Sequence, residues 1–471
     1  MSLPYRHIHI IAICGTGMAA LARMLSLAGY QVTGSDANVY PPMSTMLERQ
    51  GIPCCVGFRP ENIEPDTDLV IIGNAVPRTN HEVQAVLDRK LPYRSFPQAL
   101  AEFFLVSRYP IVVAGTHGKT TTSALMAWVL DQAGLAPGFL IGGWVRNFDA
   151  NSRPGTGRYF VVEGDEYDTA FFDKGPKFLH YRPQAAILTG IEFDHGDIFN
   201  SLDEIKTAFR KFVQLIPPDG LLFAAEGDPH VREVTGGLSA KLNTYGFNGA
   251  ADWRAQDIVF DEKGVSFRAF CGRDEFGRFQ SPMTGRHNLA NAMAVIGLSA
   301  SLGLSAEAVR KGIETFQGVK RRQEVVGEAS GVIIMDDFAH HPTAIRETLS
   351  GLRLRYPGRR IWALFEPRSA TSRSRVFQND FTLSFDAADR IVITDIFAAE
   401  KVPVERRLDP RRVVEDLRAR GREAEFIATA DEIVRRISPE LQSGDLVCVM
   451  SSGGFDSIHS KLLKALESRV G

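Results

Sequence analysis

The residues of this chain most suited to chemistry form a glycine-rich loop that runs into a lysine and threonines. Residues 115–121 read GTHGKTT, with the spacing G-x-x-G-K-T, which is shorter than the standard P-loop motif. Gly115 and Gly118 lack a Cβ, so consecutive backbone N–H groups can turn inward around an anion. We expect a bound nucleoside triphosphate, with Lys119 on its β- and γ-phosphates and the Thr120 hydroxyl on Mg²⁺. The alternative is an ordinary glycine turn.

Acidic residues gather where a strand next to this loop is expected to end. Tyr159–Val162 has the composition of a buried strand, and Glu163 follows it directly. A carboxylate at the tip of a strand beside a P-loop is well placed to hold Mg²⁺, so we predict that Glu163 binds the metal. The next acids are expected to be solvated loop charges: Asp165, Glu166 and Asp168.

A histidine lies among carboxylates after another expected strand, Ala185–Thr189. His195 follows Glu192 and Asp194 and precedes Asp197. An isolated histidine is usually structural, but a histidine among three acids at a strand end is a candidate for contact with a metal or a phosphate. We predict that His195 is a metal ligand.

The N-terminal segment carries a second glycine turn. A strand over Ile8–Ile13 is followed by Gly15, Gly17, an expected helix and a strand that ends at Asp36. This is the plan of a nucleotide-binding βαβ unit, but Ala20 replaces the third glycine of the dinucleotide fingerprint. Dinucleotide binding and a plain tight turn both remain open. Two asparagines follow a further buried strand, at the sheet edge where α/β proteins bind ligands: Asn74 and Asn80.

Polar residues also surround the start of a helix expected over Leu289–Leu302. His287, Asn288 and Asn291 precede or open this helix. An asparagine amide both donates and accepts hydrogen bonds, which suits the edge of a purine. Asn288 would serve equally well as the N-cap of the helix.

The last third of the chain adds acids, histidines and arginines. Asp336 and Asp337 follow the strand Val332–Met335, and His340 and His341 open the next helix. Their spacing matches no standard zinc site. Three arginines in a later loop either bind substrate carboxylates or only solvate a helix start: Arg368, Arg373 and Arg375.

The elements that position these residues predict an α/β fold with three domains. The 471 residues exceed what one hydrophobic core supports. We expect a Rossmann-like domain at 1–107, a central P-loop domain at 108–317 and a Rossmann-like domain at 318–471. The first boundary lies in Leu91–Pro110, which shows no clean period. The central sheet is expected to be mostly parallel, with a small antiparallel part over 241–280.

Composition and charge narrow the class of partner. The 54 basic and 56 acidic residues nearly cancel, which gives no reason to expect nucleic acid or a membrane surface. Five cysteines form no C-x-x-C pair, which is typical of reduced thiols in a cytoplasm. The short apolar run near the N-terminus indicates neither a signal peptide nor a spanning helix. We expect a cytoplasmic enzyme that acts on small molecules, and we favour a monomer.

Six motifs in series resemble the Mur ligase family. In chain order they are GTHGKTTT, E-x-D-E-x-D, IEFDH, GRHN-x-x-N, RR-x-E and DDFAHHPT. Each motif alone is weak, but this order across nearly the whole chain is specific. The resemblance implies an ATP-dependent ligase that forms an amide bond, with Mg²⁺ as the metal. It also exposes one departure, because Arg210 stands where several members carry a carbamylated lysine.

The resemblance implies a role for each matching position. ATP would contact Gly115, Thr116, His117, Gly118, Lys119, Thr120, Thr121, His287, Asn288, Asn291 and Asp337. The metal ligands would be Thr120, Glu163 and His195, and the catalytic set would be Lys119, Glu163, His195 and Arg322. A UDP-sugar would lie against Gly15, Gly17, Ser35, Asp36, Asn74 and Asn80, and a peptide against Arg368, Arg373 and Arg375.

Motifs at both ends of the chain resemble one branch of the family. ICGTGM, GSDANVYPPMST, EPRS and SSGGFDSIHSKLL are similar to the members that join UDP-N-acetylmuramate to L-alanyl-γ-D-glutamyl-meso-diaminopimelate during cell-wall recycling. The alternative is the branch that adds L-alanine alone. Either activity implies an acyl phosphate formed from the γ-phosphate of ATP, which the amine attacks, with release of ADP and phosphate. Alternatives of other classes are a nucleotide-binding oxidoreductase and a non-catalytic P-loop sensor.

Overall fold

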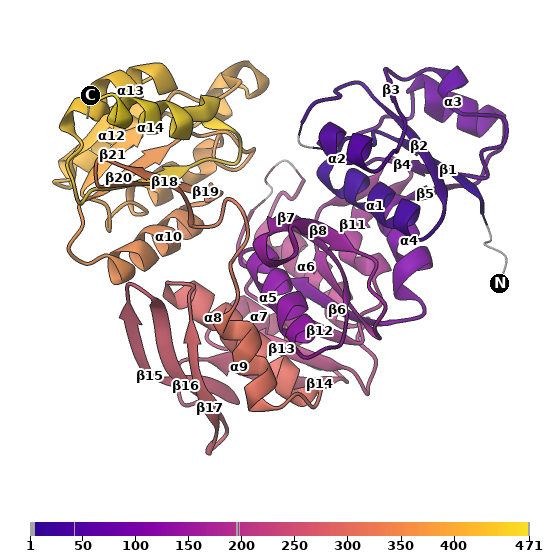
Figure 1. The fold of residues 1–471 in the computed structure, drawn as a ribbon, viewed down its shortest axis with the longest axis horizontal. Helices are drawn as coiled ribbons and strands as arrows, with labels where there is room; N and C mark the ends of the chain where they lie inside the picture. The colour runs from indigo at the N-terminus through magenta and orange to yellow at the C-terminus, as the bar shows by residue number, and fades with distance from the viewer. Residues whose placement is uncertain (1–4, 42, 195, 197, 470–471) are drawn as a thin grey trace.

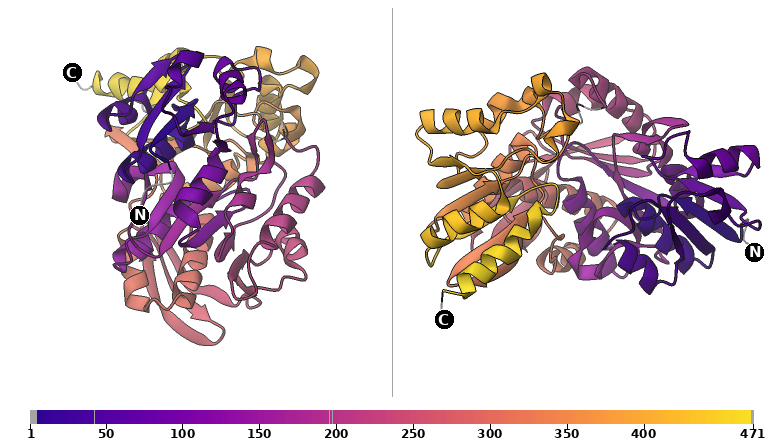
Figure 2. Two further views of the ribbon diagram at one scale, coloured as in Figure 1. Left: turned by 90° about the vertical axis from the view of Figure 1, so that its right-hand side faces the viewer. Right: turned by 90° about the horizontal axis from the view of Figure 1, so that it is seen from above.

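Three large sheets follow one another along the described part of the chain, which also contains a small two-stranded sheet. The computed structural model describes residues 5–41, 43–194, 196 and 198–469. The large sheets contain five, ten and six strands, and they lie at the upper right, the bottom and the upper left of Figure 1. Seen from above, the first and third lie at opposite ends of the molecule (Figure 2). The predicted α/β fold class is confirmed, and none of the described helices is long and apolar enough to cross a membrane.

The N-terminal sheet is parallel throughout, in the order β3-β2-β1-β4-β5. All five residues of β1 (His7–Ile11) are buried, as expected for a central strand covered on both faces. The glycine turn then leads into α1 (Thr16–Leu27). The remaining elements are β2 (Gln31–Asp36), α2 (Met43–Arg49), β3 (Cys54–Val56), β4 (Leu69–Ile72), α3 (His81–Asp88) and β5 (Tyr93–Ser95).

The segment after β5 is helical, although the sequence shows no clean period over Leu91–Pro110. Helix α4 (Phe96–Leu100) continues into a π-helix over Ala101–Leu105. A capping box between Ser95 and Gln98 fixes its start. A π-turn changes the spacing of side chains within the helix, and this explains why the sequence shows no clean helical period there.

The P-loop strand lies inside the ten-stranded sheet. Strand β6 (Tyr109–Ala114) pairs in parallel with β9 (Tyr159–Gly164) on one side and with β12 (Ala185–Leu188) on the other. Its apolar residues are therefore fully buried, as their β-branched composition predicts. Helix α5 (Lys119–Gln132) begins right after the loop. Because parallel strands end at the same edge of a sheet, the loops after β6, β9 and β12 meet there.

The antiparallel set predicted over 241–280 is only partly correct. Strand β14 (Lys241–Gly246) pairs in parallel with β13 (Leu221–Ala225), because helix α7 (Pro229–Thr235) returns the chain between them. The antiparallel part is formed by β15 (Trp253–Asp261), β16 (Gly264–Cys271) and β17 (Asp274–Ser281). The other central elements are β7 (Gly138–Val145), β8 (Ala150–Arg153), β10 (Asp168–Ala170), β11 (Asp173–Pro176), α6 (Leu202–Val213), α8 (Arg286–Ser301) and α9 (Ala306–Glu314).

The C-terminal sheet has the order β18-β19-β23-β20-β21-β22 and is parallel except for its edge strand β18. Its strands are β18 (Glu324–Ala329), β19 (Val332–Asp337), β20 (Ile361–Phe365), β21 (Arg390–Ile393), β22 (Ala424–Phe426) and β23 (Leu446–Met450). Its helices are α10 (Pro342–Arg355), α11 (Gln378–Thr382), α12 (Pro410–Ala419), α13 (Ala430–Ile437) and α14 (Ile458–Glu467).

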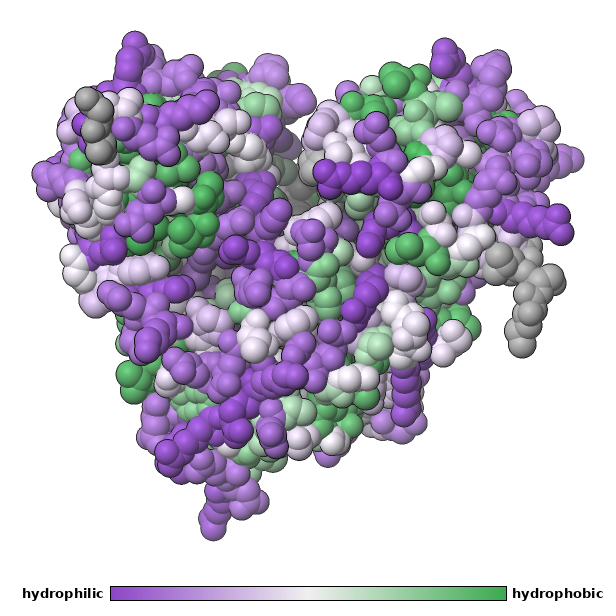
Figure 3. Space-filling view, in the orientation of Figure 1, coloured by the Kyte–Doolittle hydropathy of each residue, from purple (hydrophilic) through white to green (hydrophobic). Residues whose placement is uncertain are grey.

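The C-terminal part contacts the central part at the loop after β12. The His341 side chain lies 3.2 Å from the Phe193 carbonyl oxygen, and the rings of Phe193 and Phe377 stack at 6.1 Å. The Thr371 hydroxyl donates to Asp194. A notch separates the C-terminal and N-terminal lobes on the face shown in Figure 3. The central sheet therefore carries a lobe on each side of the edge where its parallel strands end.

Candidate active site

The glycine-rich loop depends on its two glycines. Gly115 and Gly118 have φ angles of +131° and +81°, in the left-handed region. A Cβ on Gly115 would lie 2.2 Å from Thr189 Oγ1, and a Cβ on Gly118 would lie 2.7 Å from Asn291 Oδ1. Neither position accepts a side chain. The loop therefore brings the N-terminus of α5 to the edge of the sheet, as an anion-binding loop requires.

Lys119 is folded into the loop and buried. Its Nζ donates to the carbonyl oxygens of Gly115 at 2.6 Å and Thr116 at 3.2 Å, and it lies 3.0 and 3.2 Å from the two carboxylate oxygens of Glu166. Burial alone would lower the pKa of Lys119, but the nearby carboxylates, with Glu166 foremost, raise it above its ordinary value. The lysine is therefore a protonated cation at neutral pH.

The expectation that the acids after Glu163 are solvated is wrong for two of them. Glu166 is 2 % exposed and pairs with Lys119, as described above. Asp165 pairs with Lys177 at 3.1 Å, and the charge of Lys177 holds the pKa of Asp165 below its usual range although burial opposes this. The loop can place these acids away from solvent because buried Lys119 and half-buried Lys177 supply counter-charges. Only Asp168 faces the surface, where it pairs with exposed Lys174.

Glu163 and Thr120 meet as predicted. Glu163 lies opposite Val113 in the pairing of β9 with β6, so it reaches the start of α5. The Thr120 hydroxyl donates to Glu163 Oε1 at 2.8 Å, and the Gly142 N–H donates to Oε2 at 2.8 Å. Burial and the charge of Asp165 raise the pKa of Glu163. A hydroxyl and a half-buried carboxylate, both hard oxygen donors, fit the coordination preferences of Mg²⁺.

His195 lies outside the described residues, but its neighbours are placed. The ligand atoms of His117, Glu192 and His341 lie within 4.8 Å of one another. Glu192 Oε2 is 3.2 Å from His117 Nε2, and these contacts hold the pKa of Glu192 at about 2 although burial opposes it. Sequence spacing gave no sign of this cluster, because its members come from the P-loop, the loop after β12 and the start of α10.

Two residues of the third part reach the same edge. Arg322 Nη2 lies 3.4 Å from the Thr120 hydroxyl, and its guanidinium stacks on Phe338 at 4.9 Å. Asp337 accepts hydrogen bonds from the N–H groups of Gln323 at 2.8 Å and Ala339 at 2.7 Å. Burial raises the pKa of Asp337. The structure thus brings Arg322 to the P-loop from the C-terminal part of the chain.

The start of α8 differs from the expectation. The helix begins at Arg286, so Asn288 is not its N-cap; its side-chain amide donates to the Thr284 carbonyl oxygen at 2.8 Å. Asn291 lies one turn further along the helix and approaches Gly118 of the P-loop. His287 Nδ1 lies 3.7 Å from Glu347 of α10. Asn291 therefore reaches the P-loop from α8, and His287 reaches the C-terminal part.

Several residues predicted to hold a UDP-sugar are engaged within the N-terminal sheet. The buried Ser35 hydroxyl donates to Glu82 at 2.5 Å, and Asp36 accepts from the N–H of Cys14 at 2.9 Å. Asn80 caps α3 through a 2.9 Å bond from the Glu82 N–H. Asn74 is exposed at the edge. Gly15 and Gly17 lie at the start of α1, next to this edge.

The three predicted substrate arginines make separate contacts within the C-terminal part. Arg368 stacks on the Phe397 ring at 3.6 Å and lies 3.5 Å from Glu366. Arg373 donates to backbone carbonyls, including that of Ser369 at 3.3 Å. Arg375 is exposed on a short 3-10 helix. Arg210, at the position of the family's carbamylated lysine, points outward from α6 and pairs with Glu233.

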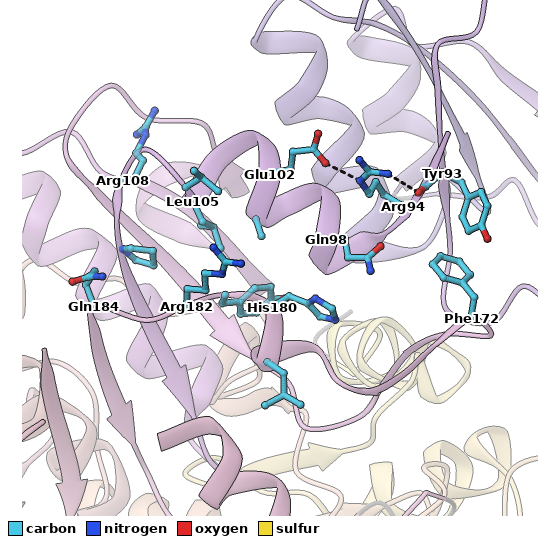
Figure 4. A pocket seen from close by; sticks show the side chains of 15 residues that line it. Tyr93, Arg94, Gln98, Glu102, Leu105, Arg108, Phe172, His180, Arg182 and Gln184 are labelled. Atoms are coloured by element: carbon cyan, nitrogen blue, oxygen red, sulfur yellow. Dashed lines mark hydrogen bonds and ion pairs between the residues drawn. The ribbon is translucent and has the colours of Figure 1, made fainter. Parts of the chain in front are cut away.

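A cavity of about 740 Å³ lies away from this edge, between the N-terminal and central parts (Figure 4). Its lining includes Pro110, at the start of β6, and Gln184, just before β12. The P-loop follows the other end of β6, so the cavity and the P-loop lie at opposite ends of the sheet. Arg94 in its wall is already paired with Glu102 at 2.8 Å.

Comparison with known proteins identifies the family. Three family models match the chain in order: the Mur ligase family catalytic domain at residues 7–108, the Mur ligase middle domain at 113–299 and the Mur ligase glutamate ligase domain at 321–453. The chain belongs to the Mur ligase family. This agrees with the site, since the middle domain contains the P-loop and the third supplies Arg322.

Individual Mur ligases match over almost their whole length. The UDP-N-acetylmuramate–L-alanyl-γ-D-glutamyl-meso-2,6-diaminoheptandioate ligase of Escherichia coli is 40% identical over 98% of this chain and 99% of its own. The UDP-N-acetylmuramate–L-alanine ligase of Caldanaerobacter subterraneus is 35% identical, with 98% of each chain covered. The crystal structure of a murein peptide ligase from Psychrobacter arcticus has a TM-score of 0.72 and 35% identity, and covers 98% of this chain and 99% of its own.

Proposed function

We propose that this Mur ligase joins UDP-N-acetylmuramate to L-alanyl-γ-D-glutamyl-meso-diaminopimelate, with ATP as the energy source. The observation that carries this proposal is the 40% identity over the whole length to the Escherichia coli ligase named for these substrates. The identity to the UDP-N-acetylmuramate–L-alanine ligase of Caldanaerobacter subterraneus is lower, at 35%. The site supports the same reaction class, because it combines a P-loop with charged residues from a second domain.

The nucleotide is proposed to lie at the edge where β6, β9 and β12 end. Lys119 would contact the β- and γ-phosphates, and the loop N–H groups would surround them. Thr120 and Glu163 would hold Mg²⁺, which supplies charge neutralisation for the phosphates when bound. His287, Asn288 and Asn291 would lie around adenine, and Asp337 would contact the ribose.

The carboxylate substrate needs activation because oxide is a poor leaving group. Transfer of the γ-phosphoryl group from ATP to the lactyl carboxylate of the sugar releases ADP and makes phosphate the leaving group. The free amine of the peptide then attacks the carbonyl carbon, loses a proton and expels phosphate as the amide bond forms. Lys119 and Arg322 would stabilise the charge that develops on the transferred phosphoryl group. Since Arg322 belongs to the C-terminal part, its contact with Thr120 supports a reaction that needs both parts together.

The UDP-sugar would lie against the N-terminal edge formed by the glycine turn, Asp36 and Asn74, and the peptide would meet Arg368 in the C-terminal part. We propose domain boundaries near residues 107 and 317, which fall between the sheets. The cytoplasm is the proposed compartment, because ATP and UDP-sugars are made there.

A competition assay tests the proposal. The enzyme receives ATP, Mg²⁺, UDP-N-acetylmuramate and equal amounts of L-alanine and the tripeptide, and the products are separated by mass. We expect the tripeptide adduct to dominate, because the recycling branch differs from the L-alanine branch in its amine substrate. A product dominated by the L-alanine adduct would support the other branch instead. Failure to release phosphate with either amine would contradict the ligase function itself.

A further inference from the structure

The donor groups of Lys119 are all engaged by partners within the protein. An ammonium group offers three N–H donors. In this structure Nζ contacts the Gly115 carbonyl at 2.6 Å, the Thr116 carbonyl at 3.2 Å and Glu166 at 3.0 Å. A triphosphate can therefore gain a hydrogen bond from Lys119 only by replacing one of these partners.

Glu166 is the partner whose replacement matters most. The two carbonyls belong to the loop and are uncharged, whereas Glu166 forms a buried ion pair in which the lysine is 9 % exposed and the glutamate 2 % exposed. A buried lysine without a counter-charge is costly, so Glu166 stabilises the resting loop. The same negative charge repels an incoming triphosphate, because the carboxylate and the phosphates would lie close together beside Lys119 in a buried site.

We infer that Glu166 is a positioning residue that sets the ATP affinity of this P-loop. It holds Lys119 in the nucleotide-free enzyme and yields the lysine to the phosphates when ATP binds. The inference rests on the proposed function in one respect, namely that ATP binds at this loop. It assigns Glu166 no contact with substrate.

The inference predicts two effects of opposite sign for Glu166→Gln. Glutamine keeps the shape and removes the charge, so ATP no longer competes with a carboxylate for Lys119 and is no longer repelled by it. ATP should therefore bind more tightly. Without nucleotide, the buried lysine loses its nearest counter-charge, so the protein should melt at a lower temperature. A purely structural role for Glu166 would produce only the second effect.

Isothermal titration calorimetry with ATP and Mg²⁺ tests this on the full chain, without UDP-sugar or peptide so that no turnover occurs. We expect the dissociation constant to fall by about tenfold in Glu166→Gln, the size of one charge-assisted hydrogen bond. Asp168→Asn is the matched control, because Asp168 belongs to the same acidic loop but pairs with exposed Lys174 at 2.9 Å. Its affinity for ATP should equal that of the unmodified chain.

Thermal melting of the same proteins gives the second readout. Glu166→Gln should melt lower without ATP and gain more from saturating ATP than the unmodified chain does. If Glu166→Gln fails to fold, Glu166→Asp provides the same test. Its side chain is one methylene group shorter, so its carboxylate lies further from Lys119. Equal or weaker ATP binding in the folded variant overturns the inference. Absence of ATP binding by the unmodified chain overturns the proposed function together with the inference.

Discussion

Buried charge is the main feature of the site at the scale of single residues. Lys119, Glu163, Asp165 and Glu166 lie within one shielded volume, and each is tied to a partner of opposite charge or to a hydrogen-bond donor. Electrostatic interactions are stronger there than in water, so the same groups can act strongly on a transferring phosphoryl group. Single substitutions at these positions should therefore change catalysis by large factors.

Replacement of Lys119 with alanine tests the centre of this arrangement. The charge-assisted hydrogen bonds that Lys119 would make to phosphate are each worth about 1.5–3 kcal/mol. We expect turnover to fall by at least about 10²-fold, since this stabilisation would be greatest in the transition state. The measurement is phosphate release with both substrates, and circular dichroism checks that the fold is kept. Near-normal turnover in the folded variant would contradict the P-loop assignment.

At the scale of elements, the site is made by the ends of parallel strands and the starts of helices. The start of helix α10 is an example. His341 is the N-cap of this helix, and its side chain accepts a hydrogen bond from the Thr343 N–H at 3.2 Å. The same ring lies against the Phe193 carbonyl of the central part. Burial lowers the pKa of His341 to about 4, so the ring is neutral at pH 7.

This depressed pKa predicts a pH dependence of stability. Between about pH 6.5, the ordinary histidine value, and about pH 4, the unfolded chain binds a proton at His341 that the folded chain does not. Stability should therefore fall as the pH falls through this window, by at most about 1.4 kcal/mol per pH unit from this group. The variant His341→Asn keeps an N-cap residue and should flatten the dependence in urea unfolding. Part of the pH dependence should remain in this variant, because burial also lowers the pKa of His9 to about 4.

At the scale of the whole molecule, the site needs two parts of the chain that fold around separate sheets. Lys119 and Thr120 come from the ten-stranded sheet, and Arg322 immediately precedes the six-stranded one. The contacts of Phe193 and Asp194 with Phe377 and Thr371 hold the two parts together. Motion of one part against the other would therefore assemble or disperse the catalytic groups.

Small-angle scattering tests this dependence on closure. We expect the radius of gyration to fall when a non-hydrolysable ATP analogue and UDP-N-acetylmuramate are both present, because ligands that bridge the parts favour the closed arrangement. Arg322→Ala should lower kcat/KM by about 10²-fold through loss of a charge that acts on the phosphoryl group. Arg210→Ala is the control, since Arg210 pairs with Glu233 on the outer face of α6. An unchanged radius together with full activity of Arg322→Ala would count against closure.

Local sequence determined much of this protein. The β-branched run of β6 and the two glycines after it predict a buried strand and an anion-binding turn, because composition and backbone freedom act over a few neighbouring residues. The local pattern of a buried strand followed by an acid also predicts that Glu163 lies beside the P-loop, and Glu163 accepts a hydrogen bond from Thr120 there. The sequence also identifies the family, because the six motifs follow one another in the family's order along the chain.

Only the tertiary structure decided which charges are buried and which segments meet. Asp165 and Glu166 read as solvated loop charges, yet Glu166 is buried and Asp165 half-buried, because Lys119 and Lys177 supply their counter-charges. The cluster of His117, Glu192 and His341 likewise joins three distant segments. Burial of a charge depends on partners brought by the fold, and such long-range pairing leaves no periodic trace in the local sequence.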